Sequence, residues 1–365
     1  MADVNSGLEG VVAAETTISL VDGSAGRLLY RGYEIGDVAA HGSFDSVTAL
    51  LLDGEWPDAA ETLPPAELDE PVLAALRGLP AGSAPLDALR TGVSAWGAAR
   101  GLDWPPTPAQ ARELIALAPA VVGGFARLRE GADPVGPAGS EGLGIAGRLL
   151  YAITGEVPET SRERALDAYF VCCAEHGLNA STFTARVVTS THSDLASAVC
   201  GAVGALKGRL HGGAPSGVRD QLTQIGSVEH AEQWNREALA RGERLMGFGH
   251  RIYRTTDPRA EALRRVAEGL AGDAAWLRLA IDVEDVALRL LAEHKPDRVL
   301  KTNVEYYASV VLDGVGLPPD LYTPAFAVAR TAGWCAHVLE QAEHGRLIRP
   351  DAKYVGPDVR PLPAS

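Results

Sequence analysis

The chain has 365 residues, of which 46% are hydrophobic, and its formal net charge is −14. This length predicts two domains with a large core, and an acidic chain without a Lys/Arg-rich tract is a poor candidate for non-specific nucleic-acid binding. No apolar run reaches the roughly 18 residues of a membrane helix, and residues 1–10 lack the basic and apolar regions of a signal peptide, so we expect a cytoplasmic protein.

The only clear β element is a hairpin within residues 10–31. A β-branched run over 11–21 is followed by the turn residues DGSAG and by an apolar return strand at 28–30. Beyond the hairpin the apolar spacing is helical, so the fold class is mainly α. Helices are predicted over residues 46–53, around Trp96, over 108–130, 140–154, 161–176 and 193–206, from 258, over 274–293, from 304, and over 323–344.

Two of these helices carry further expectations. The helix over 161–176 is amphipathic, and Gly177 is the expected C-terminal cap. The helix over 193–206 has small residues on nearly every side. Such a helix is buried all round or packs against its twin in another subunit, which favours an oligomer.

The four cysteines predict neither a disulfide framework nor a zinc site. Two of them are adjacent and none forms a CxxC pair, so we expect small buried hydrophobic side chains; the residues are Cys172, Cys173, Cys200 and Cys335. No two histidines have the helical spacing of metal ligands. We therefore predict that the protein has no metal site.

Three histidines lie at glycine-rich breaks between helices, namely His176, His211 and His250. A single histidine there would more often be a cap or a core residue. Glycine beside a histidine lets a ligand approach the backbone, and the N–H groups at helix starts bind anions. Three such breaks therefore favour a binding or catalytic site.

Two arginines stand in unusual positions. Arg259 lies in the first turn of a helix that Asp257 caps, where a cation opposes the helix dipole. Arg330 interrupts an apolar helix face, and a buried arginine needs a partner. Composition alone leaves two readings open for Arg330, an internal salt bridge and a clamp for a carboxylate ligand.

The segment GFGHRIYRTTDPR at 247–259 resembles the signature of the citrate synthase family. Four further blocks resemble that family in the same order, EHGLNAST at 175–182, LHGGA at 210–214, TNVE at 302–305 and ARTAGW at 329–334. The resemblance covers essentially the whole chain. It implies a nearly all-helical homodimer, with a large domain at 1–212 and 319–365 and a small domain at 213–318 that closes over the active site.

The resemblance also implies a reaction, in which oxaloacetate condenses with acetyl-CoA and water to give citrate and CoA. Glu305 stands where the family has its catalytic base. His211 would donate to the enol oxygen of the acetyl group, and His250 would polarise the ketone of oxaloacetate. No permanently bound cofactor is implied, because acetyl-CoA is a co-substrate.

Substrate-binding residues follow from the same matches. His176, Arg259 and Arg330 would hold oxaloacetate, and Arg349 would reach the site of the other subunit. Planar guanidinium groups suit its two carboxylates. The backbone of Gly247, Phe248 and Gly249 would lie along CoA.

Glu305 departs from the family, whose usual residue at this position is Asp. One extra methylene moves a carboxylate by about 1.5 Å, which can lower a rate on the order of a hundredfold unless the backbone compensates. Three readings stay open. The enzyme is a fully active citrate synthase, a 2-methylcitrate synthase that uses propionyl-CoA, or a weakly active paralogue that binds ligands and regulates.

Overall fold

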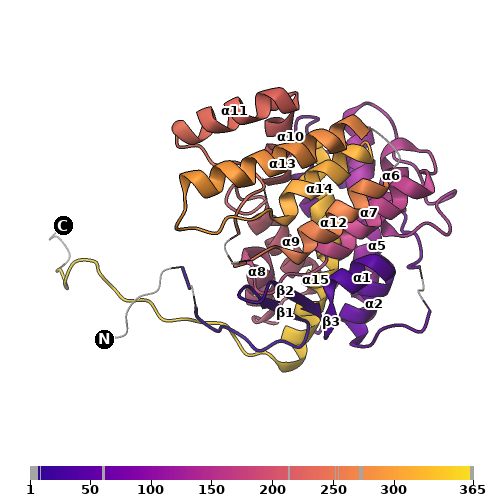
Figure 1. The fold of residues 1–365 in the computed structure, drawn as a ribbon. Helices are drawn as coiled ribbons and strands as arrows, with labels where there is room; N and C mark the ends of the chain where they lie inside the picture. The colour runs from indigo at the N-terminus through magenta and orange to yellow at the C-terminus, as the bar shows by residue number, and fades with distance from the viewer. Residues whose placement is uncertain are drawn as a thin grey trace.

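A computed structural model of the chain describes residues 7–361 apart from 9, 60, 61, 213, 251, 254 and 271–273. The fold is mainly α-helical, as predicted, with one small antiparallel sheet (Figure 1). Within the described part of the chain, no helix combines the length and apolarity that crossing a membrane requires. In chain order the elements are β1 (Ser19–Asp22), β2 (Arg27–Tyr30), β3 (Tyr33–Glu34), α1 (Ile35–His41), α2 (Phe44–Asp53), α3 (Glu70–Arg77), α4 (Pro85–Arg100), α5 (Pro108–Arg129), α6 (Ile145–Thr154), α7 (Thr160–Cys173), α8 (Ala180–Thr189), α9 (Leu195–Leu206), α10 (Ala214–Ile225), α11 (Val228–Ala240), α12 (Pro258–Gly269), α13 (Ala274–His294), α14 (Val304–Gly314), the 3₁₀ turn η1 (Pro319–Leu321) and α15 (Tyr322–His344).

The predicted hairpin is formed by β1 and β2, which pair antiparallel with Leu20 opposite Leu29. Its first strand begins only at Ser19, so the β-branched run before it is not part of the sheet. The turn is closed by Asp22, whose Oδ1 accepts the backbone N–H groups of Ser24 and Ala25, each at 2.9 Å. The short strand β3 adds a third member that the pattern does not predict.

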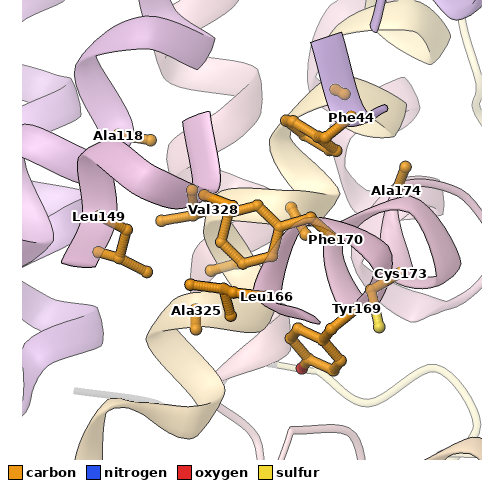
Figure 2. Close-up of a cluster of buried hydrophobic side chains, with 14 of the residues drawn as sticks. Phe44, Ala118, Leu149, Leu166, Tyr169, Phe170, Cys173, Ala174, Ala325 and Val328 are labelled. Atoms are coloured by element: carbon orange, nitrogen blue, oxygen red, sulfur yellow. The ribbon is translucent and has the colours of Figure 1, made fainter. Parts of the chain in front are cut away.

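Helix α15 runs through the centre of the hydrophobic core and is buried along most of its length. Figure 2 shows Val328 of α15 beside Phe170 of α7, and the rings of Phe44 and Phe170 meet edge to face with centroids 5.4 Å apart. A helix that is apolar on nearly every side is stable only when other helices surround it. The prediction of buried cysteines is confirmed for Cys172, Cys173 and Cys335, whereas Cys200 is only partly buried.

Helix α7 ends at Cys173, three residues before the predicted end, and the prediction that Gly177 caps it is wrong. The hydroxyl of Tyr30 lies 3.1 Å from the carbonyl oxygen of Val171 and 2.9 Å from that of Glu175, so a β2 side chain replaces continued helical bonding. Gly177 instead has a φ of +61° and turns the chain towards α8.

Helices α10 to α14 pack on one another and lie within the predicted small domain, residues 213–318 (Figure 1). A separate apolar cluster joins α11 and α13 and includes Leu239, Leu245 and Leu290. Helices α12 and α14 also pack against α7. They thereby bring the segments 247–259 and 302–305 to the turn that follows α7, although the exact domain boundary stays a prediction.

Candidate active site

Two of the three predicted histidines meet between the end of α7 and the start of α12. The ring centroids of His176 and His250 are 5.5 Å apart, in an edge-to-face arrangement. Tyr253 contacts both of them, with its hydroxyl 3.2 Å from Nε2 of His176 and its ring centroid 4.7 Å from that of His250. Burial lowers the pKa of His176 well below its ordinary value, helped by the positive charges of Arg259 and Arg330. The ring is therefore neutral near pH 7.

The backbone fixes the proton position on His250. Its Nδ1 accepts the N–H groups of Ile252 at 3.0 Å and of Tyr253 at 3.1 Å. A nitrogen that accepts cannot carry the ring proton, so the neutral ring carries its proton on Nε2. Burial, and then the charge of Arg259, lower the pKa of His250 to about 4. His250 is thus a neutral hydrogen-bond donor at physiological pH.

Arg259 is buried and pairs with Asp257 in the same helical turn. Its Nε donates to Oδ1 at 3.0 Å and its Nη2 donates to Oδ2 at 2.8 Å. The same carboxylate caps α12 by accepting the N–H of Arg259, and it also accepts the N–H of Val304 at the start of α14. Burial raises the pKa of Asp257, but the charge and hydrogen bonds of Arg259 outweigh burial and hold it below its ordinary value.

Arg330 projects from α15 and is also buried, with 2% of its surface exposed. Its Nε donates to the carbonyl oxygen of Cys173 at 2.6 Å, and its guanidinium lies 4.6 Å from the ring centre of Phe326. Burial lowers the pKa of Arg330, and the nearby negative charge of Glu175 acts in the opposite direction. The structure therefore gives Arg330 internal partners and also places its charge beside His176.

Glu305 lies half-buried in the first turn of α14, which Asn303 caps by accepting the Glu305 N–H at 3.0 Å. Burial raises the pKa of Glu305 to about 7, although the charges of Arg259 and Arg330 act in the opposite direction. A carboxyl group with a pKa near 7 is an effective base at neutral pH. These residues form a cluster of two neutral histidines, His176 and His250, two buried cations, Arg259 and Arg330, and one carboxyl group, that of Glu305, with a pKa near 7.

His211 follows α9 and contacts Ser181 of α8. Its Nε2 lies 2.9 Å from the hydroxyl of Ser181, which also accepts the indole N–H of Trp334 at 3.1 Å and donates to Oδ1 of Asn179 at 2.7 Å. Burial, and then the charge of Arg330, lower the pKa of His211 to about 4. Its ring is neutral and its orientation is fixed by Ser181.

The segment Gly247–Gly249 is tied to the start of α14. Gly249 donates its N–H to the carbonyl of Lys301 at 2.7 Å, and Asn303 donates to the carbonyls of Gly247 and Gly249. Gly247 has a φ of +85°, and an added methyl would lie 2.6 Å from the ring of Tyr306. Only glycine fits there, and the aromatic ring of Phe248 packs on Tyr306 with centroids 5.1 Å apart.

Arg349 is the one predicted site residue that lies apart. Its side chain is exposed on the extended segment that follows α15. This segment leaves the helical body beside the N-terminal segment (Figure 1). Elsewhere, in the part of the chain that the structure describes, no three His, Cys, Asp or Glu side chains are placed to hold a metal ion.

Three residues of the cluster are not predicted as site residues from the sequence. Ser181 and Tyr253 lie inside the segments that resemble the family, and Asp257 is identified only as a helix cap. A signal was present for Asp257, because a buried arginine needs an acidic partner and the Asp-Pro-Arg triplet supplies one. Nothing in the local pattern shows that Ser181 contacts His211, which is 30 residues away.

Comparisons with known proteins show the family of the chain. The family model described as "Citrate synthase, C-terminal domain" matches residues 7–351. The citrate synthase of Haloferax volcanii is 41% identical, with 97% of this chain and 96% of that protein covered. The 2-methylcitrate synthase of Mycobacterium tuberculosis H37Rv is 40% identical, with 100% and 93% covered.

Among solved structures, the citrate synthase of Thermoplasma acidophilum superimposes with a TM-score of 0.89 at 30% identity, covering 99% of this chain and 98% of that one. That structure is a ternary complex with carboxymethyl coenzyme A and oxaloacetate. The family model, the relatives and the fold agree over nearly the whole length. The chain belongs to the citrate synthase family.

Proposed function

We propose that this enzyme condenses oxaloacetate with acetyl-CoA and water to give citrate and CoA, with Glu305 as the base. The observation that carries the proposal is the position of Glu305. Its carboxyl has a pKa raised to about 7, and the charges of Arg259 and Arg330 act on it. The complex of the Thermoplasma acidophilum relative with a CoA analogue and oxaloacetate supports the choice of substrates.

The reaction begins when Glu305 removes a proton from the acetyl methyl group. His211 donates a hydrogen bond from its Nδ1–H to the enolate oxygen that forms, while the Ser181 hydroxyl turns from Asn179 and donates to His211 Nε2. The enolate carbon then attacks the ketone carbon of oxaloacetate, while Nε2–H of His250 stabilises the negative charge that develops on the ketone oxygen. This oxygen takes up the proton that Glu305 removed, which regenerates the base. Water hydrolyses the resulting citryl thioester, which releases CoA and citrate.

In this proposal, oxaloacetate is bound by His176, Arg259 and Arg330 of this chain. Both arginines are nearly fully buried, so a carboxylate that reaches them is removed from water and interacts strongly. Closure of the small domain, residues 213–318, excludes water until the carbon–carbon bond has formed.

We further propose a cytoplasmic homodimer in which Arg349 completes the site of the partner. The extended terminal segments expose several apolar side chains, among them Val12 at 86% and Val355 at 85%. Exposed apolar side chains on extended segments are typical of surfaces that a partner covers. The small-residue helix α9 offers a second packing surface.

Replacing Arg330 by alanine is expected to raise the KM for oxaloacetate about 10- to 100-fold. A charged hydrogen bond contributes about 1.5–3 kcal/mol, which corresponds to that range of affinity. Steady-state kinetics on Arg330→Ala measure the change, and Arg77→Ala serves as a control because its surface ion pair with Asp133 is half-exposed. An unaltered KM would remove Arg330 from the carboxylate clamp.

Replacing His250 by asparagine is expected to lower kcat about 10²- to 10³-fold, the loss typical of one oxyanion donor. The asparagine Oδ1 can still accept the N–H groups of Ile252 and Tyr253. The donor at the Nε2 position is lost. A kcat within twofold of the wild-type value would show that His250 does not polarise the ketone.

A 2-methylcitrate synthase is the second candidate, favoured by the relative from Mycobacterium tuberculosis and by glutamate at position 305. The candidates are separated by measuring CoA-thiol release in the presence of oxaloacetate, once with acetyl-CoA and once with propionyl-CoA. Faster release with acetyl-CoA supports the proposal. Faster release with propionyl-CoA identifies the alternative, and binding of oxaloacetate without release with either identifies a regulatory paralogue.

A further inference from the structure

The turn of the N-terminal hairpin presses against the segment that follows His250. A methyl group added to Gly23 would overlap the carbonyl oxygen of Ile252 and lie 2.7 Å from its carbonyl carbon. A methyl group on Gly26 would overlap the hydroxyl of Thr255 and lie 3.1 Å from the carbonyl oxygen of Thr256. The two backbones therefore touch, with no room for a side chain at positions 23 and 26.

The carbonyl group of Ile252 belongs to the same peptide unit as the N–H of Tyr253. That N–H donates to Nδ1 of His250 at 3.1 Å. In a trans peptide the carbonyl and the N–H point in opposite directions and move as one plane. Gly23 therefore contacts the carbonyl side of the Ile252–Tyr253 peptide, and the N–H on its opposite side fixes the ring of His250.

The hairpin itself has little freedom to retreat. Asp22 closes the turn through the N–H groups of Ser24 and Ala25 and through the Ser24 hydroxyl at 2.7 Å. Strand β1 is anchored beside the site, because the hydroxyl of Ser19 donates to Oε1 of Glu175 at 2.9 Å. A side chain at position 23 would therefore push on the Ile252–Tyr253 peptide rather than displace the turn.

We propose that Gly23 is a positioning residue for the condensation, because its missing side chain lets the hairpin hold the Ile252–Tyr253 peptide against His250. The peptide keeps the proton of His250 on Nε2, where the proposed reaction needs a donor. This inference rests on the proposed function for its catalytic consequence. The structural part, that the hairpin fixes the orientation of His250, depends only on the contacts described above.

The test substitutes alanine at Gly23 and, as a matched control, at Gly36. Gly23 lacks the positive φ that disfavours side chains, so its substitution acts through the overlap with Ile252. Gly36 lies in α1 and has open space around it. We expect Gly23→Ala to lower kcat about 10- to 100-fold, since a misplacement of about 1 Å can have that effect, and Gly36→Ala to leave kcat unchanged.

A second readout examines His250 without turnover. Nitrogen NMR on histidine-labelled protein should show His250 protonated on Nε2 alone in the wild type and in Gly36→Ala. In Gly23→Ala we expect a mixture of both tautomers. An unchanged His250 signal in Gly23→Ala would overturn the inference, even if kcat fell. Absence of thiol release by the wild type would contradict the proposed function but leave this NMR test intact.

If Gly23→Ala does not fold, Asp22→Ala carries the test. Asp22 is partly exposed, and its removal loosens the turn by three hydrogen bonds. We expect the loosened turn to release the peptide and to mix the His250 tautomers. A single Nε2–H tautomer in Asp22→Ala would overturn the inference.

Discussion

Replacing Glu305 by glutamine is expected to lower kcat about 10²- to 10⁴-fold, the range that a general base contributes. Glutamine has nearly the same shape but cannot accept the methyl proton. The Asn303 cap accepts the backbone N–H of residue 305 and does not depend on its side chain, so helix α14 keeps its start. Steady-state thiol release measures kcat, and calorimetric titration measures oxaloacetate binding, which should be nearly intact.

The matched control for this variant is Glu343→Gln, a substitution at a side chain that is 73% exposed. It should leave both kcat and oxaloacetate binding unchanged. Unchanged turnover in Glu305→Gln would remove Glu305 as the base. A joint loss of turnover and oxaloacetate binding would show instead that the residue shapes the oxaloacetate site.

Replacing Asp257 by alanine is expected to lower the free energy of unfolding by about 3–5 kcal/mol, the effect of breaking a buried ion pair. The two carboxylate oxygens accept the Nε, Nη2 and backbone N–H of Arg259 and the N–H of Val304. The variant leaves a buried guanidinium unpaired, uncaps α12 and frees the start of α14. Denaturant unfolding measures the change.

The control for this stability measurement is Asp133→Ala. Asp133 also pairs with an arginine, but its side chain is 85% exposed and that of Arg77 is 49% exposed. Exposed pairs contribute about 0.2–1 kcal/mol. If Asp257→Ala and Asp133→Ala lowered the free energy of unfolding by equally small amounts, Asp257 would not hold α12 and α14 together.

The sequence predicts which residues form the site better than it predicts how they are held. The motifs with fixed spacing contain His176, His250, Arg259, Arg330 and Glu305, and the fold brings these residues together. The supporting contacts join distant segments and leave no periodic signal. Local spacing therefore cannot reveal the contact of Ser181 with His211.

The fold likewise has parts that local sequence predicts and parts that depend on distant contacts. The long helices α5, α13 and α15 appear close to the predicted residues. Helix α11 is not predicted from the sequence, and its exposed face carries the charged residues Glu232 and Arg236. The end of α7 is decided by the distant Tyr30 hydroxyl rather than by the nearby glycine.

The pH dependence of kcat/KM for acetyl-CoA tests most directly whether Glu305 is the base. The histidines at 176, 211 and 250 are neutral at pH 6–8, whereas Glu305 has a pKa of about 7. A base acts only when deprotonated, and kcat/KM reports the pKa of the free enzyme. We predict that kcat/KM falls tenfold per pH unit below about pH 7. A value that stays constant down to pH 5 would contradict the assignment of Glu305 as the base.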